Sequence, residues 1–214
     1  MHLASPGYKF LGACSNNNMV ESLWIFYHYS LKDVKIHNLT DQIFTCDYIF
    51  DNLHFYCTFV YAMNRYQDRI TLWADHFHSA GAFSAPWLVL GDFNAILSPC
   101  EKIGPSHSQI SSREFRSTIE DCNIVEVNIT GAKYTWYRRH YNRMVSSKLD
   151  RALVSLTTLD VWDTVSSITL HRLCFDHHPI LVSLHSKHFK SSIPFKFNNA
   201  WSSDLECTRI IQDC

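Results

Sequence analysis

The sequence lacks several features that would place it in a broad class. Its 214 residues hold 19 Lys and Arg against 20 Asp and Glu, so the net charge is close to zero. Nucleic-acid binding would therefore need a local basic patch, because no global basicity supports it. No apolar run approaches the ~20 residues of a membrane span. The first residues show no basic segment followed by an apolar run, as a secretory signal would. We expect an intracellular protein with no membrane partner.

The cysteines and histidines lack the spacing of a disulfide or metal scaffold. The eight cysteines are scattered, with no Cys-x-x-Cys pair, and most lie in apolar surroundings, where a thiol behaves as a small hydrophobe. None of the 13 histidines belongs to a pair four residues apart that flanks a glutamate. We therefore expect neither a disulfide framework nor a structural zinc site.

What the sequence does contain is a series of short segments rich in aromatic and β-branched residues, separated by polar turns. This pattern is typical of strands. We predict four successive strands of one antiparallel sheet, with a turn at Asp51-Asn52 between the last two. These strands span residues 23–28, 34–39, 43–50 and 55–61.

Helical patterns then alternate with further strands. One helix is predicted from an N-cap at Asn64 to a stop at Gly81, and a second from the capping box that begins at Ser111. The residues expected to face the core are Ile70, Trp73, Phe77 and Ala80 in the first helix, and Phe115, Ile119 and Cys122 in the second. Further strands are predicted over 87–90, 124–127, 134–136, 148–155 and 178–184. Strands mixed with a few helices indicate an α/β sandwich.

The segment from Trp87 to Pro99 is the first candidate for a functional site. A short apolar run that fits a buried strand stops at Gly91, and Asp92 and Asn94 follow directly. A carboxylate and an amide at the end of a buried strand are well placed to face a substrate. The alternative is a tight turn in which either side chain caps a helical turn.

Two further acidic residues share the context of Asp92. Asp150 and Asp176 also lie near predicted strands, and Asp176 is followed by His177. Hydrolysis of a phosphodiester needs a group to orient or deprotonate water, oxygen ligands for Mg²⁺, and donors for the phosphate oxygens. These side chains supply such groups, although acidic residues next to Arg or His are also common as surface ion pairs.

A local basic patch lies between residues 133 and 151. Its cations are interleaved with tyrosines and a tryptophan, so phosphate neutralisation and base stacking are both available. The alternative is a solvated loop whose charges bind nothing specific. The cations that we expect to contact nucleic acid are Lys133, Arg138, Arg139, Arg143 and Lys148.

Three motifs together resemble the endonuclease/exonuclease/phosphatase superfamily, which has a DNase I-like fold. They are Gly91-Asp92-Phe93-Asn94, Lys148-Leu149-Asp150-Arg151-Ala152-Leu153 and Asp176-His177-His178-Pro179, in the superfamily's order and spacing. Within it, the segments 60–64, 87–99, 131–136 and 194–197 look most like the endonuclease domain of plant LINE-type non-LTR retrotransposons. The resemblance implies a four-layer sandwich of two stacked, mainly antiparallel sheets flanked by helices. It also implies an endonuclease-like domain over 1–186 and a C-terminal linker over 187–214 that leads toward a reverse transcriptase region.

The resemblance also implies roles for single residues. Asp92 would orient or deprotonate the attacking water, and Asn94 would hold the phosphate and position Asp92. Asp150 would orient His177, which would bind a phosphate oxygen. Tyr61 and Asn64 would contact the phosphate and Asp176 would help to hold Mg²⁺ or Mn²⁺, although Asn64 remains open as an N-cap and Tyr61 as a core residue. The partner would be DNA and the location, by analogy, nuclear. Nothing in the sequence identifies a protein partner.

The sequence departs from the superfamily pattern at its start. The family begins with a Trp-Asn strand and a strand ending in Gln-Glu, and that glutamate is the main metal ligand. Neither segment is present, so we expect a domain that lacks its first strands, with weakened Mg²⁺ binding and an uncovered sheet edge. Mg²⁺-dependent hydrolysis of DNA is the first functional hypothesis. The alternatives are an inactive retroelement remnant that binds nucleic acid and, less favoured, a phosphatase for phosphoinositides or other small phosphates.

Overall fold

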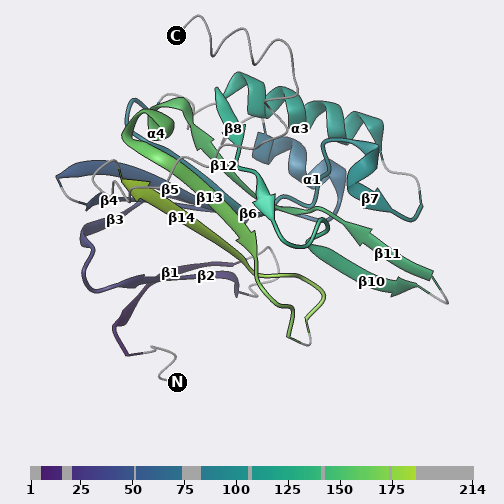
Figure 1. Cartoon of the computed structure of the whole chain (residues 1–214), viewed down its shortest axis with the longest axis horizontal. Helices are drawn as coiled ribbons and strands as arrows, with labels where there is room; N and C mark the ends of the chain where they lie inside the picture. Colours follow the sequence, from purple (N-terminus) through teal and green to yellow (C-terminus); the bar gives the residue numbers. More distant parts are fainter. Residues whose placement is uncertain are drawn as a thin grey trace, which may run out of the picture.

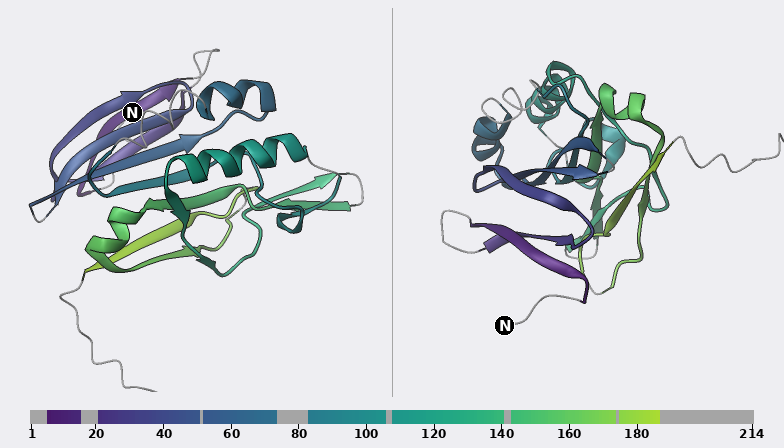
Figure 2. Two further views of the ribbon diagram at one scale, coloured as in Figure 1. Left: turned by 90° about the horizontal axis from the view of Figure 1, so that it is seen from above. Right: turned by 90° about the vertical axis from the view of Figure 1, so that its left-hand side faces the viewer.

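The largest element is a six-stranded sheet with α1 and α3 on one face and a second layer of strands on the other (Figures 1 and 2). The computed structural model describes residues 6–15, 21–50, 52–73, 83–105, 108–140, 143–173 and 175–186. In spatial order, the large sheet consists of β3 (Lys32–Leu39), β4 (Ile43–Phe50), β5 (Leu53–Tyr61), β6 (Trp87–Asp92), β12 (Asp150–Ser155) and β8 (Ile124–Glu126). All its pairs are antiparallel except β5–β6.

The second layer is in two separate pieces. One piece is the antiparallel pair of β1 (Tyr8–Ser15) and β2 (Glu21–His28). The other is the three-stranded sheet of β14 (Ile180–Ser186), β13 (Trp162–Thr169) and β9 (Ile129–Thr130). In the right-hand view of Figure 2 the purple β1–β2 pair lies apart from the green β13–β14 pair.

The remaining elements lie at the ends of the sandwich. A small sheet of β10 (Trp136–His140), β11 (Arg143–Ser147) and β7 (Lys102–Ile103) projects from one end, and the 3₁₀ turn η2 (Pro99–Glu101) precedes it (Figure 1). The helices are α1 (Tyr66–Thr71), α3 (Gln109–Asp121) and α4 (Leu156–Val161), the last of which joins β12 to β13. In the part of the chain that the structure describes, no helix is long and apolar enough to cross a membrane.

Alternation along the strands builds two cores on the two faces of the large sheet. In β6, Trp87 and Val89 face the helices, where Phe115 of α3 is fully buried, while Leu88 faces the second layer. In β12, Leu153 and Ala152 divide in the same way. This two-sided burial confirms the predicted α/β sandwich and explains why β6 and β12 read as nearly continuous apolar runs.

Several sequence predictions of strand order and helix ends were wrong. The strand at 23–28 forms, but it pairs with β1, which the sequence analysis missed, and not with the strand that follows it. The N-cap of α3 is Ser108, whose hydroxyl accepts from the Ser111 N–H at 3.3 Å, so the helix begins before the proposed capping box. The N-cap of α1 is Arg65 rather than Asn64.

The predicted inward faces of the helices are correct in part. Trp73, Phe115 and Cys122 are buried, and Ile119 packs against the same core, but Ile70 is exposed. The turn residue Asp51, the part of the predicted first helix beyond Trp73, and the predicted linker at 187–214 lie outside the described residues.

A buried ion cluster joins β12 to its neighbours. Arg151 is fully buried, and its guanidinium donates to Glu126 Oε1 at 2.7 Å, to Glu101 and to the Lys148 carbonyl at 3.2 Å. Lys148 in turn pairs with Glu126 at 2.8 Å. Because two carboxylates converge on one guanidinium in a low-dielectric setting, removal of that guanidinium leaves Glu101 without its ion-pair partner and Glu126 with Lys148 alone.

We expect Arg151→Met to lower the free energy of unfolding by about 3–5 kcal/mol. Arg138→Met serves as the matched control, since Arg138 lies exposed on β10, and it should change stability by less than about 0.5 kcal/mol. Urea denaturation followed by circular dichroism measures both. Equal losses in the two variants would contradict a stabilising role for the cluster.

Candidate active site

Strand register brings three predicted site residues to the same end of the large sheet. Asp92 ends β6 and is paired in register with Tyr61, the last residue of β5, and with Asp150, the first residue of β12. The Phe93 N–H donates to the Leu149 carbonyl at 3.0 Å and so continues the contact beyond the strands. The two aspartates, 58 positions apart in the sequence, are therefore neighbours.

The turn after β6 is built around Asp92. The Asn94 backbone N–H donates to Asp92 Oδ1 at 2.8 Å, and its side-chain amide donates to Asp92 Oδ2 at 3.1 Å and to the Ala62 carbonyl at 2.7 Å. Asn94 has φ 46°, a left-handed conformation that asparagine tolerates. The two interpretations of this segment are thus compatible, because Asp92 caps a tight turn and also faces the site.

His177 lies between the two aspartates. Its Nδ1 is 2.9 Å from Asp150 Oδ2, and its Nε2 is 3.9 Å from Asp92 Oδ2. The first contact is a hydrogen bond, whereas the second is too long for one. Nε2 therefore remains available to another group, and the Asp150 bond fixes the orientation of the ring.

Thr135 supports this arrangement, and the sequence analysis did not single it out as a site residue. It is fully buried, and its hydroxyl accepts the backbone N–H groups of Leu149 and Asp150, each at 2.9 Å. Its carbonyl accepts the His178 N–H at 2.7 Å. One residue therefore holds both the segment that carries Asp150 and the segment that carries His177. The Gly131–Trp136 segment was the only sequence signal for it.

The close charges shift the pKa values of two groups. Burial, and next the negative charge of Asp150, raise the pKa of Asp92 from 3.8 to about 6, although Asn94 and His177 oppose the shift. Burial alone would lower the pKa of His177, but the hydrogen bond and charge of Asp150, with Asp92 and Asp176, raise it above its usual value. At neutral pH the site therefore favours an ionised Asp92 beside a histidine that readily accepts a proton.

We expect NMR titration to give His177 a pKa above 6.5, the usual value, and Asp150→Asn to lower it. Raised folded-state values for both groups mean that the folded state binds protons more tightly than the unfolded state. The stability that His177 contributes is present below its unfolded pKa and declines as pH rises through its folded pKa. The raised pKa of Asp92 adds a further decline in stability as pH rises from 3.8 to about 6. An unchanged pKa of His177 in the Asp150 variant would contradict this coupling.

The residues that the structure describes do not form a recognisable metal site. Asp176 is exposed, and its Oδ2 accepts from Trp136 Nε1 at 3.1 Å. Nowhere in the described ranges do three or more His, Cys, Asp and Glu side chains come together in a way that could hold a metal ion. Because Mg²⁺ needs near-octahedral oxygen ligands, Asp92, Asp150 and Asp176 do not provide a strong site as they lie.

The other predicted site residues differ in their exposure and in their partners. Tyr61 is exposed beside Asp92, so it is not a core residue, and Asn64 is exposed in the loop after β5. Of the predicted nucleic-acid contacts, Lys148 differs from the rest, because its ammonium is engaged by Glu126. The exposed cations, which lie on or just before the β10–β11 hairpin, are Lys133, Arg138, Arg139 and Arg143.

A polar cavity of about 250 Å³ adjoins Asn94, and the sequence analysis did not predict it. Arg69 and Lys102 line it together with serines of the α3 N-terminus. Arg69 is 4% exposed, and its Nε has no hydrogen-bond partner among the described residues, although its Nη atoms donate to the Met63 and Asn64 carbonyls and to the Ser111 hydroxyl. A buried guanidinium N–H of this kind favours an anionic or carbonyl-bearing group in the cavity.

Comparison with known proteins places the fold. No family model matches the chain, and no curated protein sequence does. Among solved structures, the endonuclease domain of TRAS1, a telomere-specific non-LTR retrotransposon, is similar with a TM-score of 0.67 and 13% identity over 86% of this chain and 82% of that one.

Two further nucleases are similar to a comparable degree. An AP endonuclease from Archaeoglobus fulgidus has a TM-score of 0.62 and 13% identity over 83% of this chain and 79% of its own. The 3'-5' exonuclease NExo from Neisseria meningitidis has a TM-score of 0.61 and 16% identity over 84% and 80%. At such identities the likeness shows the fold alone, and that fold is the DNase I-like α/β sandwich of the endonuclease/exonuclease/phosphatase enzymes.

Proposed function

We propose that this chain is a phosphodiesterase of the endonuclease type, acting on DNA. The observation that carries the proposal is the position of His177, hydrogen-bonded through Nδ1 to Asp150 and with Nε2 directed at the Asp92 region, 3.9 Å from its carboxylate. A carboxylate that can accept a proton and an imidazole that can donate one are thus held at one point. Both groups accelerate in-line displacement at a phosphodiester by general acid–base catalysis.

Three side chains of the site have distinct proposed roles in such a reaction. Asp92, with a pKa raised to about 6, is ionised at neutral pH and still basic enough to orient or deprotonate water. His177, whose pKa Asp150 helps to raise, offers a charged Nε2–H to a phosphate oxygen. Asn94 fixes Asp92 through two hydrogen bonds, and Asn94 is also one of the residues that line the polar cavity.

DNA is the proposed partner because exposed cations border the site. Arg138, Arg139 and Arg143 lie on the hairpin of β10 and β11, which projects from the end of the sandwich in Figure 1. β10 also carries Trp136, whose backbone forms an isolated antiparallel β-bridge with His177 and so connects the hairpin to the site. A cationic arm of this kind neutralises backbone phosphates and makes binding sensitive to salt. Retroelement origin and a nuclear location complete the proposal and rest on the motif resemblance.

A divalent cation such as Mg²⁺ or Mn²⁺ would supply Lewis-acid stabilisation of the phosphate in this class of reaction. Since the described carboxylates form no cluster of three ligands, we propose that the cation is bound weakly. Cleavage should therefore increase with Mg²⁺ concentration without saturating in the low millimolar range.

A second candidate function is DNA binding without hydrolysis, and the same lack of a three-ligand cluster favours it. The two functions separate in one experiment with supercoiled plasmid, in which nicking is measured with Mg²⁺ and DNA binding by gel shift. Nicking that disappears with EDTA and in Asp92→Ala supports the enzyme. A gel shift without metal-dependent nicking supports the binding function. The absence of both nicking and a gel shift would contradict both functions.

A further inference from the structure

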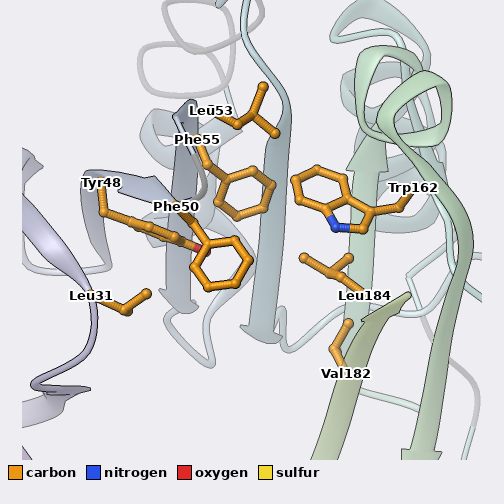
Figure 3. Close-up of a pocket in the computed structure, with 8 residues that line it drawn as sticks. All are labelled: Leu31, Tyr48, Phe50, Leu53, Phe55, Trp162, Val182 and Leu184. Atoms are coloured by element: carbon orange, nitrogen blue, oxygen red, sulfur yellow. The ribbon is translucent and has the colours of Figure 1, made fainter. Parts of the chain in front are cut away.

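An apolar cavity of about 260 Å³ lies between the two pieces of the second layer. Tyr48 and Phe55, from β4 and β5, form its floor, while Val182 and Leu184 of β14 form one wall (Figure 3). Leu31, which follows β2, lies on the opposite side. None of the described side chains that line the cavity is charged, so these walls do not favour an ionic ligand.

The cavity continues the core between the two layers. Phe55 belongs to the buried cluster on this face, and Val182 and Leu184 pack against that cluster while remaining only partly buried. Trp162 of β13 meets Phe55 edge to face at 5.1 Å between ring centroids. The apolar surface that β14 presents is therefore only half covered, which leaves part of the hydrophobic stabilisation unrealised.

The wall formed by β14 is also an open sheet edge. β14 pairs with β13 along one side, and no described strand pairs with its other side. Among the described strands, β1 and β2, which form the other piece of the layer, pair only with each other. Unpaired backbone N–H and C=O groups thus lie next to an unfilled apolar cavity, in a layer whose two pieces both end at open edges.

We propose that an extended segment of another polypeptide docks here as an added strand. Its backbone would pair with the open edge of β14, and apolar side chains at alternate positions would fill the cavity against Tyr48 and Phe55. An occupant of this kind would satisfy both features at once. A small apolar ligand would fill the cavity but leave the β14 backbone groups without partners.

A second copy of this chain does not fit the site equally well. The β14 of a copy already carries β13 on its other side, and the space beside the first β14 is bounded by Leu31 and the β1–β2 pair. A strand that belongs to a folded sheet brings its neighbours with it, whereas a single extended segment does not. The partner is therefore a free strand-forming segment, uncharged where it enters the cavity.

The probe for this proposal is a short synthetic peptide of alternating valine and threonine, with lysine at its ends for solubility. Amide hydrogen exchange of residues 180–186 is measured by mass spectrometry on the full chain, with and without the peptide. We expect exchange of β14 to slow by at least about tenfold when the peptide is bound. The same peptide N-methylated at alternate residues cannot complete the backbone ladder and should give no protection.

Matched variants locate the docking surface. Leu184→Lys places a charge in the cavity and should abolish the protection, while Leu181→Lys, at a residue that is 48% exposed on the same strand, should preserve it. The peptide pair on the unaltered chain keeps the test valid if Leu184→Lys does not fold. Three results would overturn the proposal: no protection by the peptide, equal protection by the N-methylated peptide, or protection that appears with protein concentration alone, which would assign the edge to a second copy.

Discussion

His177→Ala should lower the rate of plasmid nicking by about 10²–10⁴, because it removes the donor that the site offers to a phosphate oxygen. Asp150→Asn should account for most of this loss, since Asp150 holds the ring by the 2.9 Å bond to Nδ1. The two side chains act as one unit, so the double variant should be little worse than His177→Ala alone. Initial rates at a fixed Mg²⁺ concentration measure all three.

His178→Ala is the matched control for this series. His178 is the next residue along the chain, and its Nδ1 contacts the Leu170 carbonyl at 2.9 Å rather than either aspartate. Its removal should leave the nicking rate close to that of the unaltered chain. Equal losses in the two histidine variants, or additive losses in the double variant, would show that the Asp150–His177 pair is not the functional unit.

Gly91→Ala should destabilise the fold strongly. Gly91 has φ 140°, and a Cβ at this position would lie 2.0 Å from the Val60 carbonyl oxygen of the neighbouring strand. The clash is with backbone, so no side chain can rotate away, and β5 and β6 would have to separate beside Asp92. We expect a loss on the order of 3 kcal/mol or more in the free energy of unfolding, measured by urea denaturation.

Gly104→Ala provides the comparison. Gly104 also has a positive φ, 130°, but its added Cβ would meet a methyl group of Val145 at 2.9 Å. Both variants carry the same kind of backbone strain, and only Gly91→Ala adds a backbone clash. A loss for Gly91→Ala no larger than that for Gly104→Ala would contradict the close packing of β5 against β6.

Much of the large sheet could be predicted because burial imposes a pattern on its strands. β4 has the predicted bounds, and β5 and β6 each extend two residues beyond the predicted strand at one end. The pairing partner of β2 could not be predicted in this way, because its apolar pattern is the same whichever sheet it joins. The start of α3 was misplaced because several serines before Phe115 offer equivalent caps, and only the backbone path selects Ser108.

In the candidate site, too, some residues could be predicted from the sequence and others could not. Asp92, Asn94, Asp150 and His177 were predicted from short motifs. The register of β6 and β12 pairs the two aspartates, and hydrogen bonds join Asn94 to Asp92 and His177 to Asp150. The supporting residues were not predicted, since their roles depend on backbone groups from distant segments. Thr135 accepts from the backbone of Leu149 and Asp150, and Arg69 reaches carbonyls before α1 and a serine of α3. These contacts leave no pattern in a single sequence.

The most direct test of the account is NMR of the full chain with a short DNA duplex in the presence of EDTA, where binding is observed without hydrolysis. We predict that the His177 imidazole and the Asn94 side-chain amide shift on binding, together with backbone amides of β10 and β11. Phosphate contact should also raise the pKa of His177 further, because it adds negative charge near Nε2. Shifts confined to the hairpin, with His177 and Asn94 unchanged, would show that DNA does not reach this site and would contradict the proposed function.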